Sequence, residues 1–168
     1  MKTFVKAARI LSFSGAAALS LMAVAPVHAE DQTIIVESQE AMAEWQSDVT
    51  RSLNNRLLAE GSTPRRDLES GIVQLRFNID ANGNAQNLEM INGTGDRTTD
   101  RAAQRAVSRV AHLEDAPVAD AQSRTFQANI IFAKDHDEYN DLKAKLAKRE
   151  RVRLASADVE REVILFGG

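Results

Sequence analysis

The residues best suited to chemistry lie at positions 135–138, where the sequence reads Asp-His-Asp-Glu. Imidazole and carboxylate side chains are common metal ligands, so this cluster suggests a metal site centred on His136. Adjacent side chains on a helix point in different directions, however, so the four groups cannot converge without an irregular backbone. The His-Glu-x-x-His spacing of helical zinc sites is also absent. We therefore interpret the cluster as the acidic first turn of a helix, which complements the helix dipole and has Asp135 as its cap.

Nucleophilic catalysis finds little support either. The chain contains no cysteine, which excludes a thiolate nucleophile, a disulfide and a cysteine-ligated metal. It has no Gly-x-Ser-x-Gly nucleophile elbow, and His112 has no partner in a recognisable triad motif. Gly93-Thr94-Gly95 is too short for a phosphate-binding fingerprint. We expect no enzyme activity, no metal and no cofactor; the alternative is a hydrolase or metal protein that uses His112 or His136.

The elements that carry these residues follow from the spacing of apolar side chains. Alternation over residues 71–80 predicts a strand, the Asn82-Gly83 pair predicts a tight turn, and residues 85–91 form the return strand. Helical spacing predicts helices at about 38–59, 98–112 and 136–149, the second of them capped by Asp96 or Thr99. Trp45 lies on the apolar face of the first helix, where we expect it to pack in the core. The remaining strands are expected at 33–36, 123–133 and 163–166.

This order predicts an α+β fold. A small antiparallel sheet consists of the hairpin and a third strand at 123–133, with helices packed on one face. The N- and C-terminal strands and helices are extensions of this core. The outer runs at 33–36 and 163–166 either pair with each other or extend the sheet.

The segment from 71 to 107 resembles the C-terminal domain of TonB and TolA-like proteins. The residues that carry the resemblance are spaced along one ordered series: Gly71, Val73, Leu75, Phe77, Ile79, Asp80, Gly83, Gly95, Asp96, Asp100, Ala102, Ala103, Ala106 and Val107. A looser match extends through the strand from Thr125 to Phe132. The resemblance implies a small α+β domain that binds other proteins and has no catalytic residues. The long Pro-rich spacer of TonB proteins is missing here.

The first residues predict a secretory signal peptide. Lys2, Lys6 and Arg9 precede an apolar stretch, and Val27-His28-Ala29 is a small-residue cleavage site, so we expect residues 1–29 to be removed. The mature chain, 30–168, is then a single periplasmic domain with its core at 65–135. The alternative is an uncleaved anchor, which would make the protein a short-necked energy transducer.

Charge limits the class of partner. Loss of Lys2, Lys6 and Arg9 leaves 18 basic against 24 acidic residues, a formal charge of −6, which argues against nucleic acid. Two basic runs remain, an arginine every four residues from 97 to 109 and a lysine- and arginine-rich stretch at 143–153. The arginine stripe is interpreted as a solvated helix face, with contact to an acidic partner or anionic lipid headgroups as the alternative. The second run is interpreted as the basic C-terminal end of a helix, which suits the helix dipole, with contact to a membrane as the alternative.

The resemblance also implies a binding site. The last strand of TonB-like domains accepts an extended peptide from an outer-membrane receptor by strand addition, which links such domains to transmembrane transport. The residues that map to it here are Arg124, Thr125, Phe126, Gln127, Ala128, Asn129 and Ile130. We expect Phe126, Ala128, Ile130 and Phe132 to be buried, and the strand's edge to be either free or covered by residues 163–166. A protein or peptide partner is therefore expected, with a homodimer through exposed edges as a further alternative.

Overall fold

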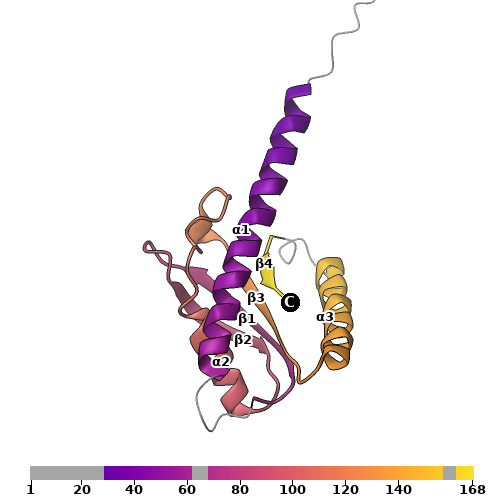
Figure 1. Cartoon of the computed structure of the whole chain (residues 1–168). Helices are drawn as coiled ribbons and strands as arrows, with labels where there is room; N and C mark the ends of the chain where they lie inside the picture. The colour runs from indigo at the N-terminus through magenta and orange to yellow at the C-terminus, as the bar shows by residue number, and fades with distance from the viewer. Residues whose placement is uncertain (1–28, 62–67, 157–161) are drawn as a thin grey trace, which may run out of the picture.

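The computed structural model describes residues 29–61, 68–156 and 162–168, and these residues fold as an α+β domain (Figure 1). Their four strands form one mixed sheet in the order β2-β1-β3-β4. The elements along the chain are α1 (Ala29–Gly61), β1 (Gly71–Ile79), β2 (Ala85–Asn92), α2 (Arg97–Val107), a 3-10 turn (Ala121–Ser123), β3 (Phe126–Phe132), α3 (His136–Ser156) and β4 (Ile164–Gly167). The expected α+β class is confirmed. Residues 1–28 of the expected signal segment lie outside the described residues.

The hairpin forms where the sequence predicts it. Asp80 accepts hydrogen bonds at Oδ1 from the backbone N–H groups of Asn82 and Asn84, both at 2.8 Å. These bonds, of which those from Asn84 weigh most, lower the pKa of Asp80 below its ordinary value. Gly83 has a φ of +77°, which a residue with a side chain rarely adopts. The turn therefore fixes the register in which β1 and β2 pair antiparallel.

The core lies between one face of the sheet and helices α1 and α2. Four aromatic rings meet there, one from each of α1, β1, β3 and β4: Trp45, Phe77, Phe126 and Phe166. All four are at most 5% exposed. Trp45 also donates from Nε1 to the backbone oxygen of His112, at 2.8 Å. The expected core role of Trp45 is confirmed, and the cluster ties the first and last elements of the chain to the central strands.

Helix α3 lies on the opposite face of the sheet. Residues of β1 and β3 alternate between the two faces, so polar side chains such as Gln74 and Gln127 point away from the core and toward α3. Leu146 is the only buried residue of α3. α1 and α2 thus share one face, as expected, and α3 covers the other.

The expected strand at 33–36 is wrong, because these residues belong to helix α1. The β-branched run there favours a strand only weakly, and context often overrides such a preference. The helix continues without a break to Gly61, and its N-terminal part extends beyond the sheet (Figure 1). The C-terminal run, in contrast, does form a strand, which adds to β3 rather than pairing with residues 33–36.

Other boundaries shift by several residues. Helix α2 ends at Val107 rather than at 112, and α3 continues past 149 to Ser156. Asp96 caps α2 as predicted, accepting from the N–H of Thr99 at 2.7 Å. Across the described ranges 29–61, 68–156 and 162–168, no helix combines the length and the apolar character needed to cross a bilayer.

Candidate functional site

The seven residues expected to bind a partner lie on β3 and on the two positions before it. Phe126, Ala128 and Ile130 point into the core and are at most 2% exposed, as expected. Phe132, also expected to be buried, packs against the core but is only partly buried. Gln127 and Asn129 point to the α3 face and are also buried, at 1% and 5% exposed. The side chains from Phe126 to Ile130 are therefore enclosed on both faces, and only the edges of this part of β3 can meet a partner.

One edge of β3 is paired with β1 and the other with β4. Phe126, Gln127, Ala128 and Asn129 are in parallel register with Ile164, Leu165, Phe166 and Gly167. The N–H of Ile164 donates to the backbone oxygen of Thr125, at 3.0 Å, and Arg124 lies 3.8 Å from the carboxylate of Glu162. Of the two states expected from the sequence, a free edge or an edge covered by the C-terminal run, the structure contains the covered one.

Helix α1 closes the outer side of β4. Its Gln46 donates from Nε2 to the backbone oxygen of Leu165, at 3.0 Å. The hydroxyl of Thr50 accepts from the N–H of Gly167, also at 3.0 Å. These two side chains satisfy backbone groups that would otherwise present an open edge to solvent. The end of the sheet is thus sealed by polar side chains rather than by another strand.

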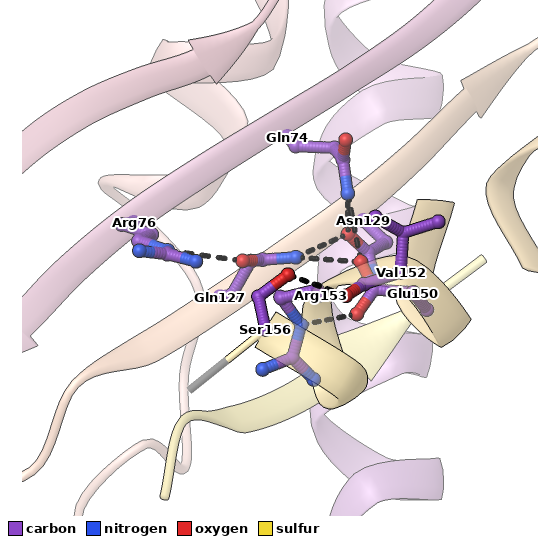
Figure 2. Close-up of polar contacts among 8 residues, drawn as sticks. All are labelled: Gln74, Arg76, Gln127, Asn129, Glu150, Val152, Arg153 and Ser156. Atoms are coloured by element: carbon purple, nitrogen blue, oxygen red, sulfur yellow. Dashed lines mark hydrogen bonds and ion pairs between the residues drawn. The ribbon is translucent and has the colours of Figure 1, made fainter. Parts of the chain in front are cut away.

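A polar network joins β1 and β3 to helix α3 (Figure 2). Glu150 of α3 accepts at Oε1 from the amides of Gln74 and Gln127, at 2.8 and 2.9 Å. The same two amides donate to Oδ1 of Asn129, each at 3.0 Å. Arg153 donates to Oε2 of Glu150 at 2.5 Å, and both side chains are at most 14% exposed. The carboxylate is therefore the shared acceptor that attaches α3 to the sheet.

Sequence reasoning missed this network. Among the described residues no buried side-chain nitrogen or oxygen lacks a hydrogen-bond partner, so every buried polar side-chain atom of the network is hydrogen-bonded. The available signal was the presence of amides at outward positions of both central strands, Gln74 on β1 and Gln127 and Asn129 on β3. Nothing in that pattern identifies Glu150, which lies more than twenty positions further along the chain, as their partner.

The opposite end of the sheet is open. β2 is the terminal strand, and within the described part of the chain no strand pairs with its outer edge. The positive φ of Asn87, +54°, accompanies irregular register between β1 and β2. Such irregularities make an edge a poor template for further strands. Ile91 is nevertheless 45% exposed on this strand.

The arginine stripe of α2 divides into two parts. Arg105 donates to Glu60 of α1 at 2.8 Å, and Arg109 lies 3.5 Å from the same carboxylate. Arg97 and Arg101, with Arg105, line a surface hollow of about 210 Å³. The stripe therefore fastens α2 to α1 at one end and faces solvent at the other.

The candidate catalytic residues are not brought together. His112 lies in the loop after α2 with a φ of +68°, and its Nδ1 is 3.1 Å from Oδ2 of Asp115, so the helix expected to reach position 112 ends before it. Asp135 accepts from the N–H of Glu138 at 2.8 Å, which confirms the predicted cap of α3. The N–H of Lys134 and the hydroxyl of Ser70 bond Glu138 and lower its pKa. In the ranges that the structure describes, no three His, Asp or Glu side chains are grouped to hold a metal.

Comparison with known proteins matches part of the chain to a family model. Residues 64–133, which include β1, β2, α2 and β3, match the family model described as the Gram-negative bacterial TonB protein C-terminal. No curated protein and no solved structure matches the chain. The matched region stops before α3 and β4, so the network with Glu150 and the covered edge are both completed by residues outside it.

Proposed function

Because residues 64–133 are a TonB C-terminal family domain, we propose that this protein is an interaction module of the cell envelope that binds a peptide or protein by strand addition at the β3 edge. The family is a non-enzymatic interaction domain whose members act in the envelope and contact proteins such as outer-membrane receptors. The proposed partner is an extended segment of such a protein, in a process linked to TonB-dependent transport. The proposed binding residues are those from Arg124 to Ile130.

The observation that supports this proposal is the pairing of β3 with β4. β4, a four-residue segment that is distant from β3 in sequence, lies along the β3 edge in parallel register. An added peptide would present the same backbone groups in the same geometry. Main-chain hydrogen bonds supply affinity in this mode, and side chains that fill pockets on alternate positions supply specificity.

A proline in β3 tests the backbone contribution. Thr125 accepts from Ile164, and Gln127, two positions further, directs its backbone to the same edge. Gln127→Pro removes an N–H from that edge. Gln127→Leu is the matched control, because it loses the side-chain amide but keeps the N–H. In a pull-down from an envelope extract, we expect wild type and Gln127→Leu to retain a partner that Gln127→Pro loses.

Circular dichroism and urea unfolding establish that both variants fold before capture is compared. If Gln127→Pro folds and captures the same partner as wild type, strand addition at this edge is wrong. Equal loss in both variants would assign recognition to the side-chain network instead.

The proposed location is the periplasm, to which residues 1–29 direct the chain as a signal peptide that is then cleaved. The basic start, the apolar stretch and the small residues before position 30 support this proposal. Mass spectrometry of the protein from the envelope fraction tests it: a mature chain beginning at Glu30 is expected, and an intact Met1 would overturn it.

A further inference from the structure

Helix α3 carries a row of basic side chains on the side that faces away from the sheet. Residues 143–153 contain six basic residues and one acidic residue, a formal charge of +5 in a chain whose total is −3. Four of the basic side chains are exposed on the outer side of the helix: Lys145, Lys148, Arg149 and Arg151. They are three or four positions apart, so they are neighbours on the helix surface. Positive charge is thus concentrated on one face of an otherwise acidic protein.

The inner side of α3 fixes this orientation. Leu146, Glu150 and Arg153 stand at positions i, i+4 and i+7, and Leu146 is 6% exposed. Glu150 accepts from the amides of Gln74 and Gln127 on the sheet (Figure 2). Arg153 pairs with the same carboxylate, so the acidic residue of the run does not offset the outer cations. The helix cannot turn the cations inward without breaking these contacts.

The four outer cations have no partner within the part of the chain that the structure describes. The ion pairs there involve other residues, and Arg153 is the only basic residue of α3 among them. Lys145 and Arg149 are like charges at i and i+4, which destabilises a helix. Figure 1 shows α3 as the outer layer on its side of the sheet. The arrangement therefore does not stabilise the fold, and it is open to an anionic partner.

Two apolar side chains lie among these cations. Val152 is 62% exposed and Leu154 is 43% exposed, which makes them two of the four large apolar side chains that are exposed in the described ranges. They stand three positions after Arg149 and Arg151, respectively. Lysine and arginine beside exposed aliphatic groups suit the interface of an anionic bilayer, where the cations meet phosphates and the aliphatic groups reach the acyl boundary. An acidic protein would meet the charges but would offer no such apolar layer.

We propose that the outer face of α3 docks the domain on an anionic lipid bilayer. The cations that meet the headgroups are Lys145, Lys148, Arg149 and Arg151, and Val152 and Leu154 enter the headgroup region. The location of that bilayer in the cell envelope rests on the proposed function, whereas the docking face goes beyond it. α3 lies outside the matched residues 64–133 and on the opposite face of the sheet from α1 and α2. Docking is therefore a property of the added helix.

Vesicle sedimentation measures this docking on the full chain as it is isolated from the envelope, with the same N-terminus in every variant. Phosphatidylcholine vesicles with about 30% phosphatidylglycerol are compared with pure phosphatidylcholine vesicles. Each lysine or arginine near an anionic surface strengthens binding about fivefold, equivalent to about 1 kcal/mol. We expect the four cations to give a preference of about 600-fold for the anionic vesicles at about 0.1 M salt. Most of this preference should be lost at about 1 M salt, where the Debye length is about 3 Å.

Two double variants locate the charges that matter. Lys148→Gln with Arg151→Gln should weaken binding to anionic vesicles about 25-fold and leave binding to neutral vesicles unchanged. The matched control, Arg97→Gln with Arg101→Gln, removes the same charge from exposed positions of α2. Its effect should stay within about twofold, because α2 lies across the sheet and salt screens it from the membrane. Circular dichroism and urea unfolding establish that both variants fold.

A fluorescent label reports which face meets the lipid. The chain contains no cysteine, so Val152→Cys and Arg97→Cys each provide one attachment point for an environment-sensitive dye. We expect the emission of the dye at position 152 to shift to the blue on anionic vesicles, and that of the dye at position 97 to stay unchanged. A shift at both positions, or at neither, would overturn the proposal.

Other outcomes would overturn it as well. Equal losses in the two double variants would assign binding to net charge, and equal binding to anionic and neutral vesicles would exclude recognition of anionic lipid. Polyglutamate at the same charge concentration is the probe for an acidic protein; if it binds as tightly as the vesicles and releases the chain from them, the face recognises protein. Capture of the envelope partner, measured without lipid, separates the two proposals. Capture that depends on the β3 edge without vesicle binding rejects only the docking face, and vesicle binding without capture rejects only strand addition.

Discussion

Removal of the Glu150 carboxylate should separate helix α3 from the sheet. Glu150→Ala deletes the acceptor shared by the amides of Gln74 and Gln127 and the ion pair with Arg153. Each amide keeps its bond to Asn129 and loses the other. The variant therefore leaves one donor on each of two strands without a partner, in a region where water has little access.

The loss in the free energy of unfolding follows from the hydrogen bonds that Glu150→Ala removes. A hydrogen bond to a charged group contributes about 1.5–3 kcal/mol, so the two bonds from the amides alone amount to about 3–6 kcal/mol. The Glu150 side chain is 14% exposed, and water that enters the vacated space restores part of this. We expect the free energy of unfolding to fall by about 2–4 kcal/mol. A loss of this size is a large share of the stability of a small domain.

Urea unfolding followed by the fluorescence of Trp45 measures this change, because Trp45 is the only tryptophan and lies in the core. Asp141→Ala is the matched control: it removes a carboxylate from the same helix at an exposed position. Its effect should stay within about 0.5 kcal/mol. A comparable loss in both variants would mean that α3 responds to charge in general and not to the network.

A double-mutant cycle with Gln127→Leu tests whether the contacts act together. Because both side chains contribute to one bond within one network, their effects should differ from additivity by about 1 kcal/mol or more. Additivity within about 0.3 kcal/mol would refute the reasoning, since it would mean that Glu150 and Gln127 do not share a stabilising contact.

The central hairpin and the second helix could be predicted because their signals are local. Alternation from Val73 to Ile79 sets the buried face of β1, and the glycine of the turn fixes where the strand reverses. Asp96 caps α2 through a residue three positions away. Each of these features depends on neighbours within one turn or one hairpin, so sequence spacing contains the necessary information.

The covered edge and the polar network could not be derived in the same way. The pairing of β4 with β3 depends on Phe166 reaching a space that Trp45, Phe77 and Phe126 create from three other elements. The sequence allowed equally a β3 edge covered by residues 163–166 and a free β3 edge. The run at 33–36 has strand-forming residues too, but α1 presents Gln46 and Thr50 to the last edge and leaves no place for another strand.

Two further predictions concern the buried ring of β4 and the N-terminal cap of α2. Phe166→Ala should lower the free energy of unfolding by about 3 kcal/mol, because a buried ring is lost from the contact with Trp45, whereas Leu165→Ala on the more exposed face should lower it by about 1 kcal/mol or less. Urea midpoints followed by Trp45 fluorescence compare the two variants, and equal losses would contradict the burial argument. The second prediction is a loss of stability in acid. The N–H and hydroxyl of Thr99 lower the pKa of Asp96, so the carboxylate's contribution is present above the ordinary pKa and is lost as the pH falls through the lowered value, below about 4. Asp96→Asn keeps a capping oxygen but does not titrate, so its thermal midpoint should fall less than that of wild type between pH 5 and about pH 2. Parallel curves for the two proteins across this range would mean that the cap of α2 makes no contribution to acid sensitivity.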